Sequence, residues 1–136
     1  MTSVSHPAPA LTVIMANRNA AAFLQAAVES VLTQSFRDLE LIVSDDGSTD
    51  DSLDVLSRMK DPRLRVLTVP ISTGPGAARN RALEAARGQW LAVVDSDDLM
   101  HVDRFQTLID RAEETDAQLI ADNQLFFTDQ GQTTGE

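Results

Sequence analysis

Short apolar runs alternate along the chain with stretches in which apolar residues recur every three or four positions. The runs have the length and aliphatic content of buried strands, and they cover residues 11–15, 39–43, 64–69, 90–94 and 118–121. The stretches between them predict helices over residues 20–33, around Leu53, Leu56 and Met59, and over residues 77–87 and 102–114. Strands that alternate with helices form parallel sheets. The pattern therefore predicts a Rossmann-like α/β fold, with a mainly parallel sheet and helices on both faces.

The ends of the chain lack this periodicity. Residues 1–10 contain two prolines and neither the basic nor the apolar segment of a signal peptide, so we expect a flexible tail. Residues 128–136 are rich in Gly, Thr and Gln and are expected to form a loop. No apolar run approaches the roughly 20 residues that a membrane-spanning helix needs.

Two acidic clusters each follow closely behind a predicted strand. Asp45-Asp46-Gly47-Ser48 comes after residues 39–43, and Asp95-Ser96-Asp97-Asp98 comes after residues 90–94. Open α/β sheets bind ligands beyond the carboxyl ends of their strands, where both clusters fall. Crowded carboxylates repel one another unless a cation neutralises them, so the pattern favours a metal and phosphate site. Acidic turns that only cap the next helix are the alternative.

The net charge of −10, from 21 acidic and 11 basic residues, narrows the choice of partners. It argues against nucleic acid and against an anionic membrane surface, and a Mg²⁺ or Mn²⁺ ion would offset part of it. The chain has no cysteine, which excludes disulfides and thiolate metal ligands and is compatible with the cytoplasm.

Further turns are predicted at the same edge of the sheet. Gly74-Pro75-Gly76 opens a helix, and Arg79, one turn into it, can balance the acidic clusters or a pyrophosphate. A structural ion pair is the alternative for Arg79. Asn17-Arg18-Asn19 leaves the first strand, either as a ligand contact or as a plain connection.

In their order and spacing, these motifs resemble one family, the family 2 inverting glycosyltransferases of GT-A fold. The resemblance covers residues 11–127, and the segments that carry it are 12–15, 29–36, 45–50, 76–80 and 95–98. It implies metal-dependent transfer of a sugar from a nucleotide-diphospho-sugar to an acceptor hydroxyl, in a single displacement with inversion. The implied setting is polysaccharide or cell-envelope glycan synthesis, with a glycan, a lipid-linked molecule or another hydroxyl compound as acceptor.

The resemblance also implies which residues bind the donor. The implied nucleotide-sugar contacts are Ala16, Arg18, Asp45, Asp46, Arg79 and Asp97. Among them, Asp46 would bind the nucleobase edge with Asp45 beside it. Arg79 would lie near the diphosphate or hold the acidic cluster.

The second acidic cluster is implied to be the metal site, with Mn²⁺ or Mg²⁺ as the cofactor. Asp97 and Asp98 would form its working part, one toward the ribose or the metal and one on the metal itself. Asp95 would be an outer member of the site.

The chain departs from the family pattern in two places. Relatives usually show Pro-Thr-Tyr-Asn where this chain has Met15-Ala16-Asn17-Arg18-Asn19, and the Arg18 guanidinium can stack in place of the aromatic ring. Nothing up to Glu136 matches the family's acceptor-binding part with its carboxylate base. We therefore expect the donor-binding part of a longer enzyme, with residues 128–136 leading to the missing part and the catalytic base beyond Glu136.

Other classes of protein share part of this pattern. A nucleotidyltransferase normally has a Gly-rich, basic loop after its first strand, and residues 17–20 do not have that composition. A receiver-like signalling module needs an acid pair after the first strand and a lysine late in the sheet, whereas the only lysine, Lys60, lies near a helix end. A non-catalytic nucleotide-binding module is disfavoured by the intact acidic clusters.

The expected location is the cytoplasm, with the full-length protein peripheral to the inner face of the membrane. A sheet face left open by the missing part could drive self-association into a homo-oligomer.

Overall fold

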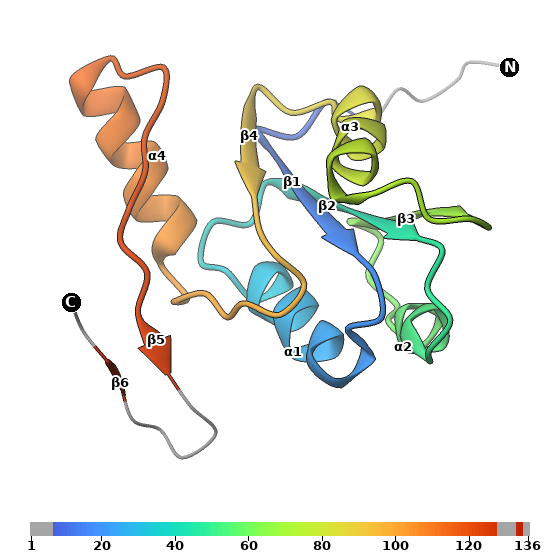
Figure 1. The fold of residues 1–136 in the computed structure, drawn as a ribbon. Helices are drawn as coiled ribbons and strands as arrows, with labels where there is room; N and C mark the ends of the chain where they lie inside the picture. The colour runs from blue at the N-terminus through green and yellow to red at the C-terminus, as the bar shows by residue number, and fades with distance from the viewer. Residues whose placement is uncertain (1–6, 128–132, 135–136) are drawn as a thin grey trace, which may run out of the picture.

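The computed structural model describes residues 7–127 and 133–134 of the chain. Its larger sheet has four strands, all parallel, in the order β3-β2-β1-β4 (Figure 1). The strands are β1 (Leu11–Asn17), β2 (Leu39–Asp46), β3 (Leu64–Val69) and β4 (Trp90–Val93), and the helices are α1 (Ala21–Leu32), α2 (Ser52–Ser57), α3 (Pro75–Ala85) and α4 (Arg104–Thr115). The predicted α/β fold with a parallel sheet is confirmed.

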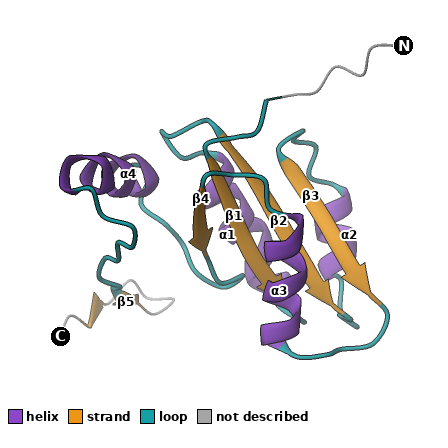
Figure 2. Cartoon of the chain, turned by 90° about the horizontal axis from the view of Figure 1, so that it is seen from above, coloured by secondary structure: helices purple, strands orange, loops and turns teal. Residues whose placement is uncertain are grey.

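Helices cover both faces of the sheet, as predicted. α1 and α2 pack on one face and α3 on the other (Figure 2), so the central strands β1 and β2 are buried along nearly their whole length. On the α1 face, Val13 and Met15 belong to the larger core cluster. On the α3 face, Ile14 and Ile42 pack with Ala82. Because alternate residues of a strand point to opposite faces, a strand buried on both sides reads as a continuous apolar run.

The strand register brings the acidic segments to one edge of the sheet. Asn17 at the end of β1 pairs with Asp45 of β2. β4 pairs with β1 as far as Val93, opposite Ile14, and the Val94 N–H then donates to the Ile14 carbonyl oxygen at 3.1 Å. The chain therefore leaves β2 and β4 at the same carboxyl edge, with an acidic cluster at each exit.

The helix bounds differ from the predicted ones by one or two residues. α3 begins at Pro75 rather than at residue 77, since proline is favourable at the first position of a helix. α4 begins at Arg104 rather than at residue 102, and α2 ends at Ser57, so Met59 lies outside it.

The predicted fifth strand over residues 118–121 is wrong. These residues run back beside α4, away from the sheet (Figure 1), and form no strand. Among the described residues no strand pairs with this segment, and Leu119 is 88% exposed. An ion pair of Arg104 with Asp122, at 2.8 Å, holds the segment against α4.

The predicted loop over residues 128–136 is wrong in part. β6 (Thr133–Thr134) pairs antiparallel with β5 (Phe126–Phe127), and threonine and phenylalanine both favour extended backbone. The rest of that loop, and residues 1–6 of the predicted tail, lie outside the described residues. Residues 7–10 form neither helix nor strand, and the Trp90 N–H donates to the Ala10 carbonyl oxygen at 2.9 Å.

Candidate functional site

A cavity of about 350 Å³ opens at the carboxyl edge of the sheet. Its lining comes from the ends of β1 and β2, from the segments that follow β3 and β4, and from α3. It includes residues 16–18, Asp46, Ser72, Gly74, Arg79 and residues 95–97, but not Asp98. α/β folds bind their ligands at this edge, where polar groups from separate strands converge.

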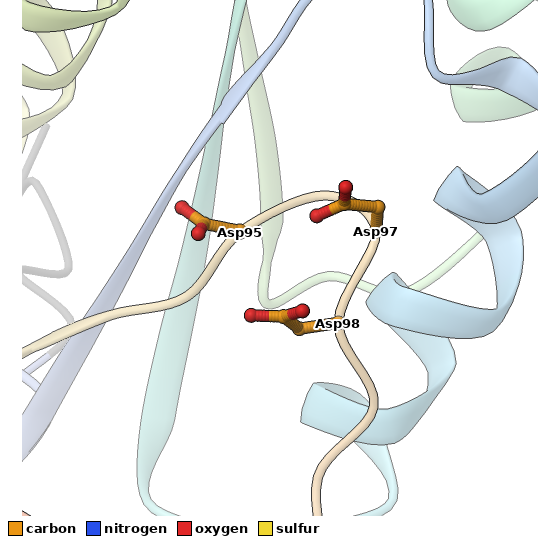
Figure 3. Close-up of side chains that lie close together, drawn as sticks. All are labelled: Asp95, Asp97 and Asp98. Atoms are coloured by element: carbon orange, nitrogen blue, oxygen red, sulfur yellow. The ribbon is translucent and has the colours of Figure 1, made fainter. Parts of the chain in front are cut away.

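The carboxylates of the second acidic cluster gather on the loop between β4 and α4 (Figure 3). Oxygen atoms of Asp95, Asp97 and Asp98 lie within 4.8 Å of one another, with Asp95 and Asp97 exposed and Asp98 partly buried. Burial and the charges of Asp97 and Asp95 raise the pKa of the Asp98 carboxyl above its usual value, while Arg104 opposes the shift. A cation at this point would relieve the repulsion.

The protein itself supplies little to neutralise this cluster. Arg79 donates from Nη2 to Asp95 Oδ1 at 3.2 Å, in an ion pair that is about half exposed and so contributes little to stability. Within residues 7–127, the carboxylate oxygens of Asp97 and Asp98 accept no hydrogen bond from the protein. Carboxylate oxygens with free lone pairs are the ligands that Mg²⁺ and Mn²⁺ prefer. The residues present therefore fit a hard divalent cation.

The carboxylate of Asp46, unlike those of Asp97 and Asp98, is fully engaged by hydrogen-bond donors of the protein. Its carboxylate accepts hydrogen bonds from five donor groups: the N–H groups of Thr73 and Gly74, the hydroxyls of Ser72 and Thr73, and Arg81 Nη2 at 2.8 Å. The Thr73 N–H first, and the Ser72 hydroxyl next, hold the pKa of the Asp46 carboxyl well below its usual range. Gly74 lies at φ 101°, a left-handed conformation that glycine adopts without strain. Asp46 is therefore ionised at neutral pH and ties the turn before α3 to the end of β2.

The partners of Asp46 were not among the residues predicted from the sequence. Ser72 and Thr73 had a usable signal, because they follow the predicted strand over residues 64–69 at the same edge as the acidic clusters. Arg81 had none, since nothing in the sequence distinguishes it from Arg79 two residues earlier. In the structure Arg81 also donates from Nη1 to Thr73 Oγ1 at 2.7 Å.

The structure brings Ala16 and Arg18 to the cavity but turns Asp45 away from it. Asp45 is fully buried and accepts hydrogen bonds from Asn17 Nδ2 at 2.9 Å and from the N–H and hydroxyl of Ser48 at 3.0 and 2.6 Å. It therefore joins the end of β1 to the turn after β2, and holds Asn17, which lines the cavity, in place.

Comparison with known proteins decides the family. The pattern of the family described as Glycosyl transferase family 2 matches residues 12–135. The chain belongs to this family. As a family 2 member it shares the alternating architecture and parallel sheet of the GT-A glycosyltransferases, as expected from the sequence.

Curated relatives of this family 2 chain are much longer than the chain itself. It is 40% identical over 115 residues to the succinoglycan biosynthesis protein ExoO of Rhizobium meliloti (strain 1021), a match that covers 85% of the chain and 33% of ExoO. It is 39% identical over 88 residues to the UDP-Glc:alpha-D-GlcNAc-diphosphoundecaprenol beta-1,3-glucosyltransferase WfaP of Escherichia coli, covering 65% of the chain and 35% of WfaP. The chain thus spans about a third of the length of these relatives.

Solved structures of similar proteins include donor complexes. S. aureus TarS 1–349 superimposes with a TM-score of 0.72 at 29% identity, over 76% of this chain and 32% of TarS 1–349, and TarS is known with UDP and with UDP-GlcNAc. The mannosyltransferase PcManGT from Pyrobaculum calidifontis, in complex with GDP-Man and Mn²⁺, has a TM-score of 0.63 at 27% identity, over 68% of this chain and 29% of PcManGT.

None of the helices in the described part of the chain has the length and apolar character needed to cross a bilayer.

Proposed function

We propose that this chain is the donor-binding part of a glycosyltransferase that moves a sugar from a nucleotide-diphospho-sugar to a hydroxyl group with inversion. The observation that carries the proposal is the cavity at the carboxyl edge of the sheet, which is lined by Asp46 and also by Asp95 and Asp97, with a carboxylate oxygen of Asp98 within 4.8 Å of theirs. Such a cavity offers separate places for a base and for a metal-bound diphosphate. The donor complexes of TarS and PcManGT support nucleotide-sugars as the ligand class.

The nucleoside is proposed to lie along the ends of β1 and β2. Ala16 and Arg18 would flank it, with the planar guanidinium of Arg18 stacked on the base. Asp46 would face the base edge, with Asp45 holding the turn beside it. Because five donor groups already engage Asp46, a base N–H can bind there only if one of them moves away. The side-chain donors Ser72 and Arg81 can rotate, whereas the backbone N–H groups are fixed by the turn.

The diphosphate is proposed to lie between Arg79 and the second acidic cluster. Asp97 and Asp98 would hold Mn²⁺ or Mg²⁺, with Asp97 also near the ribose and Asp95 as an outer member of the site. When bound, the ion would offset the negative charge that builds up on the leaving diphosphate. Arg79 already lies beside Asp95 and would place a second positive charge next to the phosphates.

Acceptor binding is proposed to need polypeptide of the kind that makes up the additional length of the relatives. Residues 128–136 would lead to it, and a carboxylate beyond Glu136 would deprotonate the acceptor hydroxyl. A second cavity, of about 370 Å³, lies between β4 and α4 and is lined by Trp90, Leu91 and Leu108. We propose that the acceptor-binding part packs near this face, and that without it the face favours homo-oligomers.

The cellular role is proposed from the names of the relatives. ExoO is a succinoglycan biosynthesis protein, and WfaP acts on a diphosphoundecaprenol-linked sugar. We infer that the acceptor of the whole protein is a growing glycan, a lipid-linked sugar or another hydroxyl compound in polysaccharide or cell-envelope synthesis. Cytoplasmic residence, at the inner face of the membrane, follows from that role.

Calorimetric titration with UDP, GDP, CDP and dTDP tests the proposal. We expect one diphosphate to bind in the presence of Mn²⁺ and to be released when EDTA is added. Asp98→Asn should abolish the metal-dependent part of the binding. Asp103→Asn, an exposed neighbour whose side chain makes no capping bond to α4, should not. If all four diphosphates fail to bind with and without Mn²⁺, the donor-site assignment is wrong.

A further inference from the structure

Gln34 is a fully buried polar residue just beyond the end of α1, with its side chain directed at the start of α4. Its Nε2 donates to the carbonyl oxygen of Ser30 at 3.0 Å and to that of His101 at 2.7 Å. Its Oε1 accepts from the N–H of Phe105 at 3.1 Å. The amide group thus links the end of one helix to the beginning of another that lies about 70 residues away in the chain.

The bond to Phe105 replaces a missing helix cap. The first N–H groups of a helix have no partner within it and usually receive one from the side chain of the N-cap residue. In α4 the N-cap residue, Asp103, makes no such bond. Gln34 supplies the acceptor instead, from a different element of the fold. A neighbouring backbone bond, from the N–H of Ser35 to the carbonyl oxygen of Val102 at 2.8 Å, attaches the same stretch of chain.

These bonds fix one end of the loop that carries the acidic cluster. The loop is attached to the sheet at its beginning, where the Val94 N–H donates to Ile14. Its other end is the stretch from His101 to Phe105, which Gln34 holds against α1, and the Phe105 ring is buried in the main core. The cluster lies between these two attachments, so the position of His101 limits where Asp97 and Asp98 can lie relative to Asp95.

We propose that Gln34 is a positioning residue for the divalent cation: by holding His101 and Phe105 it sets the separation of the three carboxylates at residues 95–98. The inference rests on the metal site of the proposed function. A loop with three like charges tends to open unless its ends are fixed. Residues that orient metal ligands from outside typically change metal affinity by about 10- to 100-fold when they are removed.

The test compares Gln34→Met with Gln25→Met, in the whole chain. Methionine has nearly the volume of glutamine but makes none of its hydrogen bonds. Gln25 lies in α1 and is exposed, bonded only to Glu29 at 3.0 Å, so it controls for the substitution itself. Mn²⁺ affinity is measured from the electron paramagnetic resonance signal of free Mn²⁺, without nucleotide and well below the unfolding temperature. It is expressed per folded molecule, from circular dichroism of the same samples.

A further control separates positioning from loss of stability. Glu40→Gln removes a buried carboxylate at the opposite end of β2, far from the acidic loop, and is expected to lower stability without touching the loop. We expect Gln34→Met to weaken Mn²⁺ binding at least about 10-fold per folded molecule. Gln25→Met and Glu40→Gln should bind Mn²⁺ like the wild type. If Gln34→Met does not fold, Gln34→Asn, which keeps the amide but shortens its reach, is used and carries the same expectation.

The outcomes distinguish this inference from the proposed function. Wild-type protein that binds Mn²⁺, together with a Gln34 variant of equal affinity per folded molecule, contradicts the positioning role alone. Equal losses in Gln34→Met and Glu40→Gln also contradict it, because they would reflect stability. Wild-type protein that binds no Mn²⁺ contradicts the metal site itself, and the inference with it.

Discussion

Strand β2 and the loop after β4 differ in how their carboxylates are paired. Glu40 and Asp46, near the beginning and at the end of β2, are buried and surrounded by hydrogen-bond donors. The Glu40 carboxylate accepts from Thr12 Oγ1 at 2.8 Å and from three nitrogen atoms of Arg87. Asp97 and Asp98, in the loop after β4, accept no hydrogen bond from residues 7–127. The carboxylates of β2 are therefore occupied by donors of the protein, whereas those of Asp97 and Asp98 are available to a ligand.

The largest effect on stability is expected at Gly88, which packs against the backbone of β1. A Cβ atom on Gly88 would lie 2.4 Å from the Thr12 nitrogen and 2.7 Å from the Leu11 carbonyl carbon, which are backbone atoms of β1 and cannot move aside cheaply. We expect Gly88→Ala to lower the free energy of unfolding by at least about 3 kcal/mol, measured by urea denaturation. Gly76→Ala is the matched control, because nothing lies within 4 Å of its added Cβ, and it should raise stability by about 0.5 kcal/mol. Equal effects would show that this region is not tightly packed.

The next effect concerns Glu40 itself. Glu40→Gln keeps the shape but replaces a charged acceptor by an amide, leaving donors of Arg87 and Thr12 without their partner. Because Arg87 and Arg65 are about half exposed and can turn to water, we expect a loss of about 2 kcal/mol rather than the larger cost of a fully buried pair. A variant as stable as the wild type would mean that these bonds contribute nothing net.

The same residue predicts a pH dependence. Burial raises the pKa of the Glu40 carboxyl, but the bonds from Thr12 and Arg87 outweigh it and hold the pKa below the usual 4.5. A carboxyl whose pKa is lower in the folded protein stabilises it above the unfolded-state pKa, and this contribution is lost as the pH falls toward the folded value. The stability difference between wild type and Glu40→Gln should therefore shrink steadily below pH 4.5, measured by urea denaturation at several pH values. A difference that stays constant would contradict the assignment.

The smallest effect on stability is expected from a change at Asp98, in the acidic loop after β4. The raised pKa of the Asp98 carboxyl means that its charged form is disfavoured in the folded protein. Asp98→Asn removes that charge, so in metal-free buffer the free energy of unfolding should stay the same or rise, by no more than about 1 kcal/mol. A clear loss of stability would show that Asp98 has a structural partner after all, and would weaken the contrast with β2.

The sequence was sufficient for the features that depend on local pattern. The consecutive apolar residues of β1 and β2 predict strands buried on both faces, and the helices on both faces follow from the alternation. The acidic clusters could be assigned to one edge because every parallel strand ends there. Arg79 was identified as a cation near the cluster, and it does lie beside Asp95.

Features that depend on contacts across the fold could not be read from the sequence. The Asp45 side chain points into the protein because it accepts a hydrogen bond from Asn17 in the neighbouring strand. The partnership of Arg81 with Asp46 depends on how α3 packs. Residues 118–121 have the composition of a strand, but a strand also needs a partner, and none of the described strands pairs with them. Gln34 looks like an ordinary polar residue after a helix, and only its burial against α4 shows otherwise.

The measurement that tests the contrast most directly is the unfolding temperature of the wild type and of Asp98→Asn, each with and without Mn²⁺. A ligand that binds only the folded state stabilises it, by about 2.7 kcal/mol at a concentration one hundred times its dissociation constant. We expect Mn²⁺ to raise the unfolding temperature of the wild type and to leave that of Asp98→Asn nearly unchanged. Equal shifts in both proteins, or none in the wild type, would contradict the claim that the carboxylates of Asp97 and Asp98 are left available for a cation.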